Sequence, residues 1–206
     1  MKIFITGTDT NVGKTVISAW IAIHTKSAYF KPIQTGEKEG SDCQNVKKIS
    51  PFTQIYSPIY GYQDTLSPHL AANLKNDFIQ LKKITLPRAS NIVIEGAGGI
   101  LVPLNETHLM IDLIQKFDVP VILVSRTSLG TINHTLLSLE ALRARNISIL
   151  GVIMNGDQNT ENSQAIKNYG RTTILAEFPK LCKVSYSELK KINFSENFQN
   201  LLFRKS

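Results

Sequence analysis

The sequence has little cysteine and no long apolar run. Two cysteines among 206 residues, Cys43 and Cys182, cannot form a framework of disulfides, so a reducing cytoplasm is the simplest setting. Neither cysteine has a histidine or second cysteine at the spacing of a metal site, so we expect no redox or metal role for them. No stretch approaches the roughly eighteen apolar residues of a membrane span. These absences predict a cytoplasmic protein without a membrane partner.

The charge of the chain is unbalanced but not concentrated. Lysine and arginine number 23 against 16 acidic residues, giving a net charge of +7. Nucleic-acid surfaces often combine basic runs with aromatic residues, and this sequence has no such run. We therefore expect no nucleic-acid partner. Part of the positive charge can serve a triphosphate and an acidic substrate, and the rest is expected on the solvated surface.

The chain alternates between two kinds of apolar segment. Runs rich in isoleucine and valine, typical of strands buried on both faces, cover residues 2–6, 91–95, 120–125 and 147–155, and further candidate strands lie at 28–32 and 172–179. Segments with apolar residues three and four apart, typical of helices, cover 14–26, 108–117 and 133–145. This alternation predicts an α/β fold in a single domain, residues 1–206, with a mostly parallel sheet and helices on both faces.

The segment GTDTNVGKT, residues 7–15, lies between the first strand and the first helix. Counting back from Lys14 and Thr15, the usual phosphate-binding pattern has its first glycine at position 8, but here that position is Thr8 and the glycine is Gly7. The order of strand, glycine loop and helix nevertheless favours a P-loop NTPase over an ordinary turn. In such a loop the lysine reaches the β- and γ-phosphates and the threonine hydroxyl binds Mg²⁺.

Three more charged residues are candidates for the same site. Glu95 ends a strand before GAGG, Lys31 ends another in FKPIQTG, and Asp42 lies in GSDCQNV. In parallel sheets, ligands bind beyond the carboxyl ends of the strands. The carboxylates are therefore candidate Mg²⁺ ligands, and Lys31 could stabilise a transferring phosphoryl group. Each has a plainer alternative, since Asp42 could cap a helix and Lys31 could be a surface lysine.

Together these pieces resemble the dethiobiotin synthetase family. The shifted glycine and the Thr-Asp-Thr filling are features of that family's phosphate loop. The matching stretches run in the family's order as far as about Asn155: GTDTNVGKT (7–15), KPIQTG (31–36), SD (41–42), SPH (67–69), EGAGG (95–99), PL (103–104) and LGTINH (129–134).

The resemblance implies an ATP-dependent ligase that acts on diaminopelargonate (7,8-diaminononanoate). In that family one amine takes up CO₂ as a carbamate, and the carbamate attacks the γ-phosphate of ATP. The other amine closes the ring on the carbamic–phosphoric anhydride, which yields dethiobiotin, ADP and phosphate. By the family's pattern the catalytic residues are Lys14, Lys31 and Thr10, and Mg²⁺ is held by Thr15, Asp42 and Glu95.

The resemblance also assigns binding residues. Those expected to bind nucleotide are Thr8, Asp9, Thr10, Asn11, Val12, Gly13, Lys14, Thr15, Glu95, Gly98, Asn155 and Pro179. Those expected to bind substrate are Thr10, Lys31, Thr35, Gly98, Gly130, Thr131 and Asn133. The last three belong to a segment that the family takes from the second subunit, which implies a homodimer with the substrate tail bound across the interface. Thr131 or Asn133 could also simply cap a helix.

The sequence departs from the family pattern at two positions. Two other classes of protein are alternatives to this family. Asn11 stands where many relatives carry an acidic residue, and Gly156 follows Asn155 where an aspartate is common. The second departure predicts weaker selectivity for ATP over other triphosphates. A partition-type ATPase would share the fold and the loop, but Asp9 stands where that class has a second lysine. A related amide-forming ligase would usually need a glutaminase domain, for which this length leaves no room.

Overall fold

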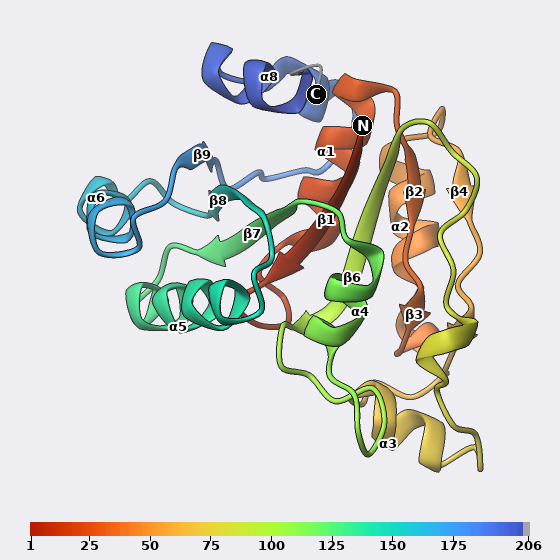
Figure 1. Cartoon of the computed structure of the whole chain (residues 1–206). Coiled ribbons are helices and arrows are strands. Elements are labelled where there is room, and N and C mark those ends of the chain that lie inside the picture. The colour runs from red at the N-terminus through yellow and green to blue at the C-terminus, as the bar shows by residue number, and fades with distance from the viewer. Residues whose placement is uncertain (204–206) are drawn as a thin grey trace.

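A parallel sheet forms the centre of the protein in a computed structural model that describes residues 1–203 (Figure 1). Seven strands follow the order β4-β2-β6-β1-β7-β8-β9, and each neighbouring pair is parallel. Their bounds are β1 (Lys2–Gly7), β2 (Ala28–Phe30), β4 (Ile55–Tyr56), β6 (Ile92–Gly99), β7 (Val121–Arg126), β8 (Ile149–Asn155) and β9 (Ile174–Phe178). A separate parallel pair joins β3 (Ile33–Gln34) to β5 (Tyr60–Gly61).

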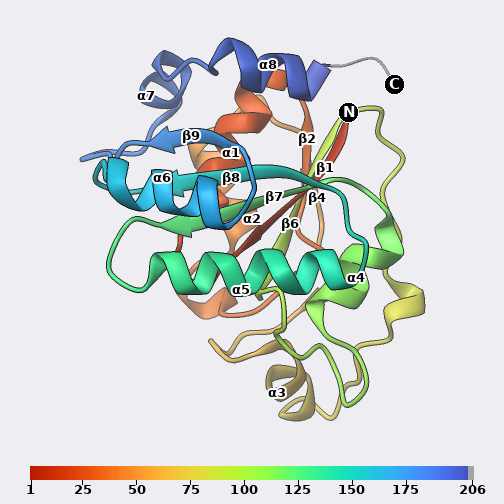
Figure 2. The same ribbon diagram turned by 60° about the vertical axis from the view of Figure 1, so that its left-hand side comes forward.

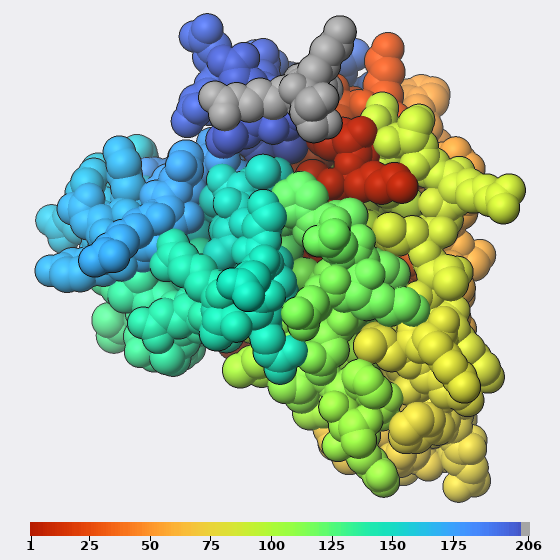
Figure 3. All heavy atoms as spheres, in the orientation of Figure 1, coloured from red at the N-terminus to blue at the C-terminus, as the bar shows by residue number. Residues whose placement is uncertain are grey.

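Helices cover both faces of this sheet, as the sequence predicts. One face packs against α1 (Lys14–Thr25), α2 (Asp42–Ile49), α7 (Tyr186–Lys191) and α8 (Glu196–Phe203). The other packs against α4 (Met110–Phe117), α5 (Thr131–Ala144) and α6 (Thr160–Tyr169). Figure 2 shows α7 and α8 beside α1, with α5 on the opposite side of the strands. The yellow segment around α3 (Pro68–Asn73) projects at the lower right of the space-filling view (Figure 3).

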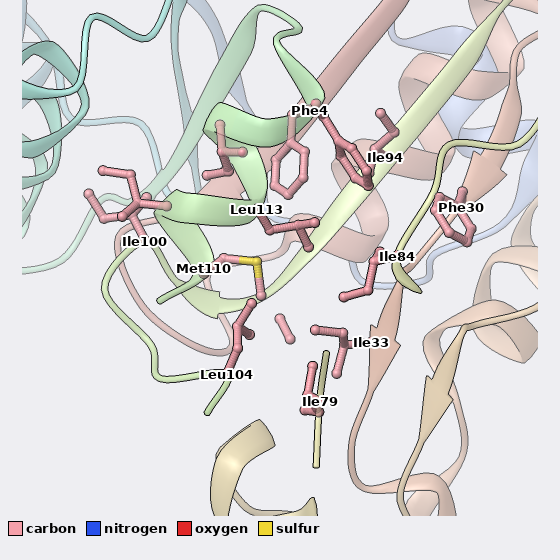
Figure 4. Close-up of a cluster of buried hydrophobic side chains, with 14 of the residues drawn as sticks. Phe4, Phe30, Ile33, Ile79, Ile84, Ile94, Ile100, Leu104, Met110 and Leu113 are labelled. Carbon is pink, nitrogen blue, oxygen red and sulfur yellow. The ribbon is translucent and has the colours of Figure 1, made fainter. Parts of the chain in front are cut away.

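The central strand β1 is buried on both sides. Ile3 and Ile5 contribute to the apolar cluster beneath α1, whereas Phe4 belongs to the cluster beneath α4. Figure 4 shows Phe4 near Ile94 of β6 and Leu113 of α4. Because successive side chains of a strand point to opposite faces, a strand covered on both faces needs an unbroken apolar run. That requirement explains the sequence of β1.

The C-terminal part of the chain completes the face that carries α1. Trp20 of α1 is fully buried and packs edge-on against Phe178 and Phe194, with ring centroids 5.0 and 4.7 Å apart. Its indole N–H donates to the carbonyl of Ile192 at 2.7 Å. The segment after β9, where the family resemblance gives little guidance, therefore has a clear packing role.

Some boundaries differ from those expected. The helix expected at 133–145 begins two residues earlier, at Thr131, and the strand expected at 147–155 begins at Ile149. The edge strand β4 lies within residues 33–88, where no strand was expected. Across residues 1–203, none of the helices combines the length and apolar character needed to cross a bilayer.

Candidate active site

The loop between β1 and α1 has a backbone that requires its two glycines. A Cβ added to Gly7 would lie 2.7 Å from Val12 Cγ2 and 3.0 Å from the carbonyl oxygen of Asp9. Gly13 has a φ of +96°, and a Cβ there would lie 2.0 Å from Asn155 Nδ2. Asn11 also has a positive φ, of 55°, which asparagine tolerates better than most residues. The glycine is therefore at position 7 because the loop folds back over the end of β1.

Lys14 is the first residue of α1 and lies buried beneath this loop. Its Nζ donates to the carbonyl oxygen of Asp9 at 2.8 Å. Burial lowers the pKa of the Lys14 ammonium from 10.5 to about 8, and the charge of Glu95 only partly opposes this shift. A phosphate bound in the loop would supply negative charge beside this ammonium and favour its protonated form.

A buried group of opposite charges joins β2, α2 and β6. Lys31 Nζ lies 2.5 Å from Asp42 Oδ2 and 3.0 Å from Glu95 Oε1. Lys31 is 5% exposed and Glu95 is 1% exposed. Burial alone would lower the pKa of Lys31, but the charges of Glu95 and Asp42 outweigh it and raise that pKa. Lys31 is thus not a surface lysine, because both carboxylates hold its charge inside the protein.

The hydroxyl of Thr15 connects this group to the phosphate loop. Thr15 Oγ1 lies 2.9 Å from Asp42 Oδ1 and 2.9 Å from Glu95 Oε1. A hydroxyl has one hydrogen to donate, so it can satisfy only one of these two acceptors at a time. The three oxygens together form an acceptor-rich cluster, which is the donor chemistry that Mg²⁺ prefers.

Asp42 is not the cap of its helix. Ser41 is the N-cap of α2, and its hydroxyl accepts the backbone N–H of Gln44 at 3.2 Å. The carboxylate of Asp42, at the first helical position, is free to face Lys31. Burial would raise the pKa of Asp42, but the Lys31 charge outweighs it and lowers that pKa.

Two residues of this group were not among the candidates. The hydroxyl of Tyr29 donates to Glu95 Oε2 at 2.9 Å. Gln34 accepts the backbone N–H of Asp42 at 2.9 Å and directs its amide nitrogen to Asp42 Oδ2 at 3.3 Å. Both side chains orient the carboxylates. Tyr29 stands two residues before Lys31, a spacing that puts side chains on the same side of an extended chain. This spacing is the sequence feature that could have identified Tyr29 as part of the group.

The residues expected to contact the base lie on the other side of the phosphate loop. Asn155 ends β8, and its Nδ2 donates to the carbonyl oxygen of Val12 at 2.9 Å. Together with Gly156, Phe178 and Pro179 it lines a hollow of about 350 Å³. The side-chain amide of Asn155 therefore borders both the loop and an open space large enough for a ring.

The expected substrate-binding residues are more dispersed. Thr10 lines a second hollow, of about 400 Å³, formed by the phosphate loop, residues 99–102 and α5. Gly98 lies at the end of β6, next to that hollow, whereas Thr35 follows β3.

The segment that opens α5 has one buried and one exposed side chain. Gly130 is the N-cap of α5, where no side chain of the described residues forms a cap hydrogen bond. The hydroxyl of buried Thr131 donates to the Arg126 carbonyl at 2.5 Å, while Asn133 is exposed. Neither side chain caps the helix, so that alternative was wrong.

Comparisons with known proteins show which family the chain is similar to. A protein-family model described as an AAA domain matches residues 1–187. The chain is 50% identical over 201 residues to the ATP-dependent dethiobiotin synthetase BioD of Lawsonia intracellularis, with 98% of each chain covered. It is 47% identical over 184 residues to the enzyme of that name from Paramagnetospirillum magneticum, with 89% of this chain and 90% of the relative covered.

A solved structure supports the same fold. The cell division ATPase MinD of Pyrococcus furiosus matches with a TM-score of 0.56 at 14% identity, covering 86% of this chain and 83% of that one. At such low identity the match concerns the fold alone. The sheet, the glycine loop and the helix that follows it have the architecture of the P-loop NTPases.

Proposed function

Because the chain belongs to the ATP-dependent dethiobiotin synthetase family, we propose that it forms dethiobiotin from diaminopelargonate, CO₂ and ATP through a carbamate. The enzyme is an ATP-dependent ligase. One amine of diaminopelargonate adds CO₂ and loses a proton. The resulting carbamate oxygen attacks the γ-phosphorus, and ADP leaves. The second amine attacks the carbonyl carbon of the mixed anhydride, which closes the ring and releases phosphate with that oxygen attached.

Lys14 and Lys31 stabilise the charge that this sequence of steps creates. A carbamate and a triphosphate are both anionic, so bringing them together requires positive charge between them. Lys14 lies under the phosphate loop, and Lys31 lies near Thr15 at the start of α1. Ring closure is intramolecular, and Thr10 and Thr35 help to position the reacting groups. No nucleophilic side chain is needed.

The cluster of Thr15, Asp42 and Glu95 fits Mg²⁺. The Thr15 hydroxyl lies 2.9 Å from a carboxylate oxygen of Asp42 and 2.9 Å from one of Glu95. All three groups offer hard oxygen ligands. Among the described residues, no group of three acidic, cysteine or histidine side chains lies close enough together to hold a metal ion. A metal here would therefore also depend on Thr15, on phosphate oxygens and on water. When bound, Mg²⁺ supplies positive charge to the phosphate oxygens. Lys31 lies between the two carboxylates and has to share them with the metal.

The remaining contacts of the substrates follow the family pattern. Asn155 and Pro179 contact the base in the 350 Å³ hollow, and the backbone N–H groups of loop residues 8–15, with the Lys14 ammonium, hold the phosphates. Backbone N–H groups at the start of α5, near Gly130, bind the substrate's carboxylate tail from a second subunit. The enzyme is thus a cytoplasmic homodimer of one-domain subunits that acts on small molecules only.

The observation that carries this proposal is the buried contact of Lys31 with Asp42 and Glu95, beside Thr15 of the phosphate loop. The test is ADP release by the purified protein with ATP, Mg²⁺, diaminopelargonate and bicarbonate. We expect one ADP for each dethiobiotin, and little ADP when either diaminopelargonate or bicarbonate is omitted. ADP release that stays the same when diaminopelargonate or bicarbonate is omitted would contradict the proposal.

A further inference from the structure

Arg126 lies between the two hollows and contacts both of their walls. It is the last residue of β7, paired in register with Asn155, and it lines the 350 Å³ hollow. Its Nη1 lies 3.4 Å from Asp9 Oδ2, and its Nη2 lies 3.2 Å from His134 Nδ1. Asp9 and His134 both line the 400 Å³ hollow. The reaction proposed above gives Arg126 and His134 no role.

Asp9 presents an electrostatic problem for the phosphate loop. Its carboxylate belongs to the loop that receives a triphosphate, and like charges at short range repel. One carboxylate oxygen accepts the backbone N–H of Thr10 at 2.7 Å, and the other faces the Arg126 guanidinium. Arg126 therefore supplies the positive charge that offsets Asp9 when phosphate enters the loop.

His134 is fixed by the same guanidinium. Arginine has only hydrogen-bond donors, so a contact with His134 Nδ1 requires that this nitrogen be an acceptor. With Nδ1 accepting from Arg126, the ring hydrogen of His134 lies on Nε2. Arg126 thus orients the ring of His134 and leaves a donor for a ligand in the 400 Å³ hollow.

We propose that Arg126 is a positioning residue that offsets the charge of Asp9 for triphosphate binding and orients His134 for the amino-acid substrate. One side chain at the end of β7 thereby couples the phosphate loop to the segment that opens α5. This inference rests on the proposed function for the identity of the substrate. The part of the inference that concerns Asp9 and the nucleotide depends only on triphosphate binding.

The test compares Arg126→Met with two companions and a matched control. Asp9→Asn keeps an oxygen that accepts the Thr10 N–H but removes the charge, and the double variant Asp9→Asn/Arg126→Met lacks both charges. Arg145→Met is the control, because Arg145 and Asp112 form an arginine–aspartate pair 2.6 Å apart at the far end of α5 with similar arginine exposure, 41% against 37%. Kd for a non-hydrolysable ATP analogue is measured by calorimetry, and KM and kcat for diaminopelargonate by dethiobiotin formation.

We expect Arg126→Met to raise Kd for the ATP analogue roughly five- to tenfold, within the usual range of coupling between neighbouring sites. The double variant should return to within about twofold of wild type, because the repulsion is gone. KM for diaminopelargonate should rise in Arg126→Met and stay raised in the double variant, because His134 remains unheld. Arg145→Met should resemble wild type in both measurements.

Three results would overturn the inference. They are an unchanged Kd in Arg126→Met, a double variant that binds as weakly as the single one, and an unchanged KM for diaminopelargonate. If Arg126→Met does not fold, Asp9→Asn alone still tests whether the Asp9 charge opposes nucleotide binding. The Asp9→Asn variant should bind the analogue at least as tightly as the wild-type protein. A wild-type protein that binds the analogue but forms no dethiobiotin would refute the proposed function, and the Kd series would still decide the role of Arg126 toward Asp9.

Discussion

The two ends of the sheet both carry positive charge, but they hold it in different ways. At the carboxyl ends of the strands, Lys31 is buried between Asp42 and Glu95. At the amino ends, a hollow of about 950 Å³ is lined by residues that include Lys26, Arg88 and Lys190. These three are exposed, and none of the residues lining that hollow, in the part of the chain the structure describes, is acidic.

The candidate site does not lie at the larger hollow. The hollow at the amino ends is more than twice as large as either hollow beside the phosphate loop. Exposed cations keep their water and cost the fold little. A buried ammonium loses its hydration and remains charged only with partners that offset this loss. The buried and charged Lys31 is therefore a stronger candidate for a functional residue than the exposed cations of the larger hollow.

The largest difference between the two ends should appear when lysines of each end are replaced one at a time. Lys31→Ala and Lys14→Ala should each lower kcat by about 10²–10³, the loss typical of a missing electrostatic donor in a transition state. Lys26→Ala, from the larger hollow, should stay near wild type. Steady-state dethiobiotin formation measures the effect, and thermal unfolding checks that each variant is folded. A folded Lys31→Ala enzyme with near-normal turnover would contradict the role of the buried lysine.

A smaller effect should follow from changing one carboxylate of the buried group. Glu95→Gln should raise the Mg²⁺ concentration at half-maximal activity by at least about tenfold, since even residues behind the ligands change metal affinity by 10–100-fold. Glu188→Gln serves as the control, because Glu188 pairs with Lys191 at the surface, away from this cluster. A magnesium titration with each variant gives the comparison, and an unmoved midpoint for Glu95→Gln would show that Glu95 is not a ligand.

The smallest effect concerns the base hollow. Gly156 supplies no side-chain oxygen to a base, and discrimination depends on polar groups that the wrong base leaves unpaired. We expect the preference for ATP over GTP or CTP in kcat/KM to stay below about a hundredfold, which corresponds to about 2.8 kcal/mol. Asn155→Ala should shrink that preference further. A larger preference for ATP, or a preference that Asn155→Ala leaves unchanged, would show that other residues recognise the base.

The fold was predictable because the strands are covered on both faces. Burial on both sides leaves unbroken apolar runs, which marked β1, β6, β7 and β8 in the sequence. The edge strand β4 has only two residues, and so short a strand leaves no periodic pattern to detect. The start of α5 at Thr131 was expected two residues later, at 133, because no capping side chain marks the helix start.

The candidate site was predictable where chemistry is concentrated in short motifs. Lys14 and Thr15 follow from the loop, and Glu95 from its place before a glycine turn. The contacts of Tyr29 and Gln34 with the carboxylates depend on how β2, α2 and β6 pack, which no local pattern specifies. Arg126 reaches Asp9 across 117 positions of the chain, so its contact could be found only in the folded structure.

The most direct test of the proposed carbamate mechanism follows the oxygen of CO₂. If the carbamate attacks the γ-phosphorus and ring closure then expels phosphate, one oxygen from CO₂ must end in the released phosphate. A brief single-turnover reaction with ¹⁸O-labelled bicarbonate in ordinary water, read by the ³¹P isotope shift, measures this transfer. We expect one labelled oxygen in each phosphate that accompanies dethiobiotin. Unlabelled phosphate formed together with dethiobiotin would contradict it.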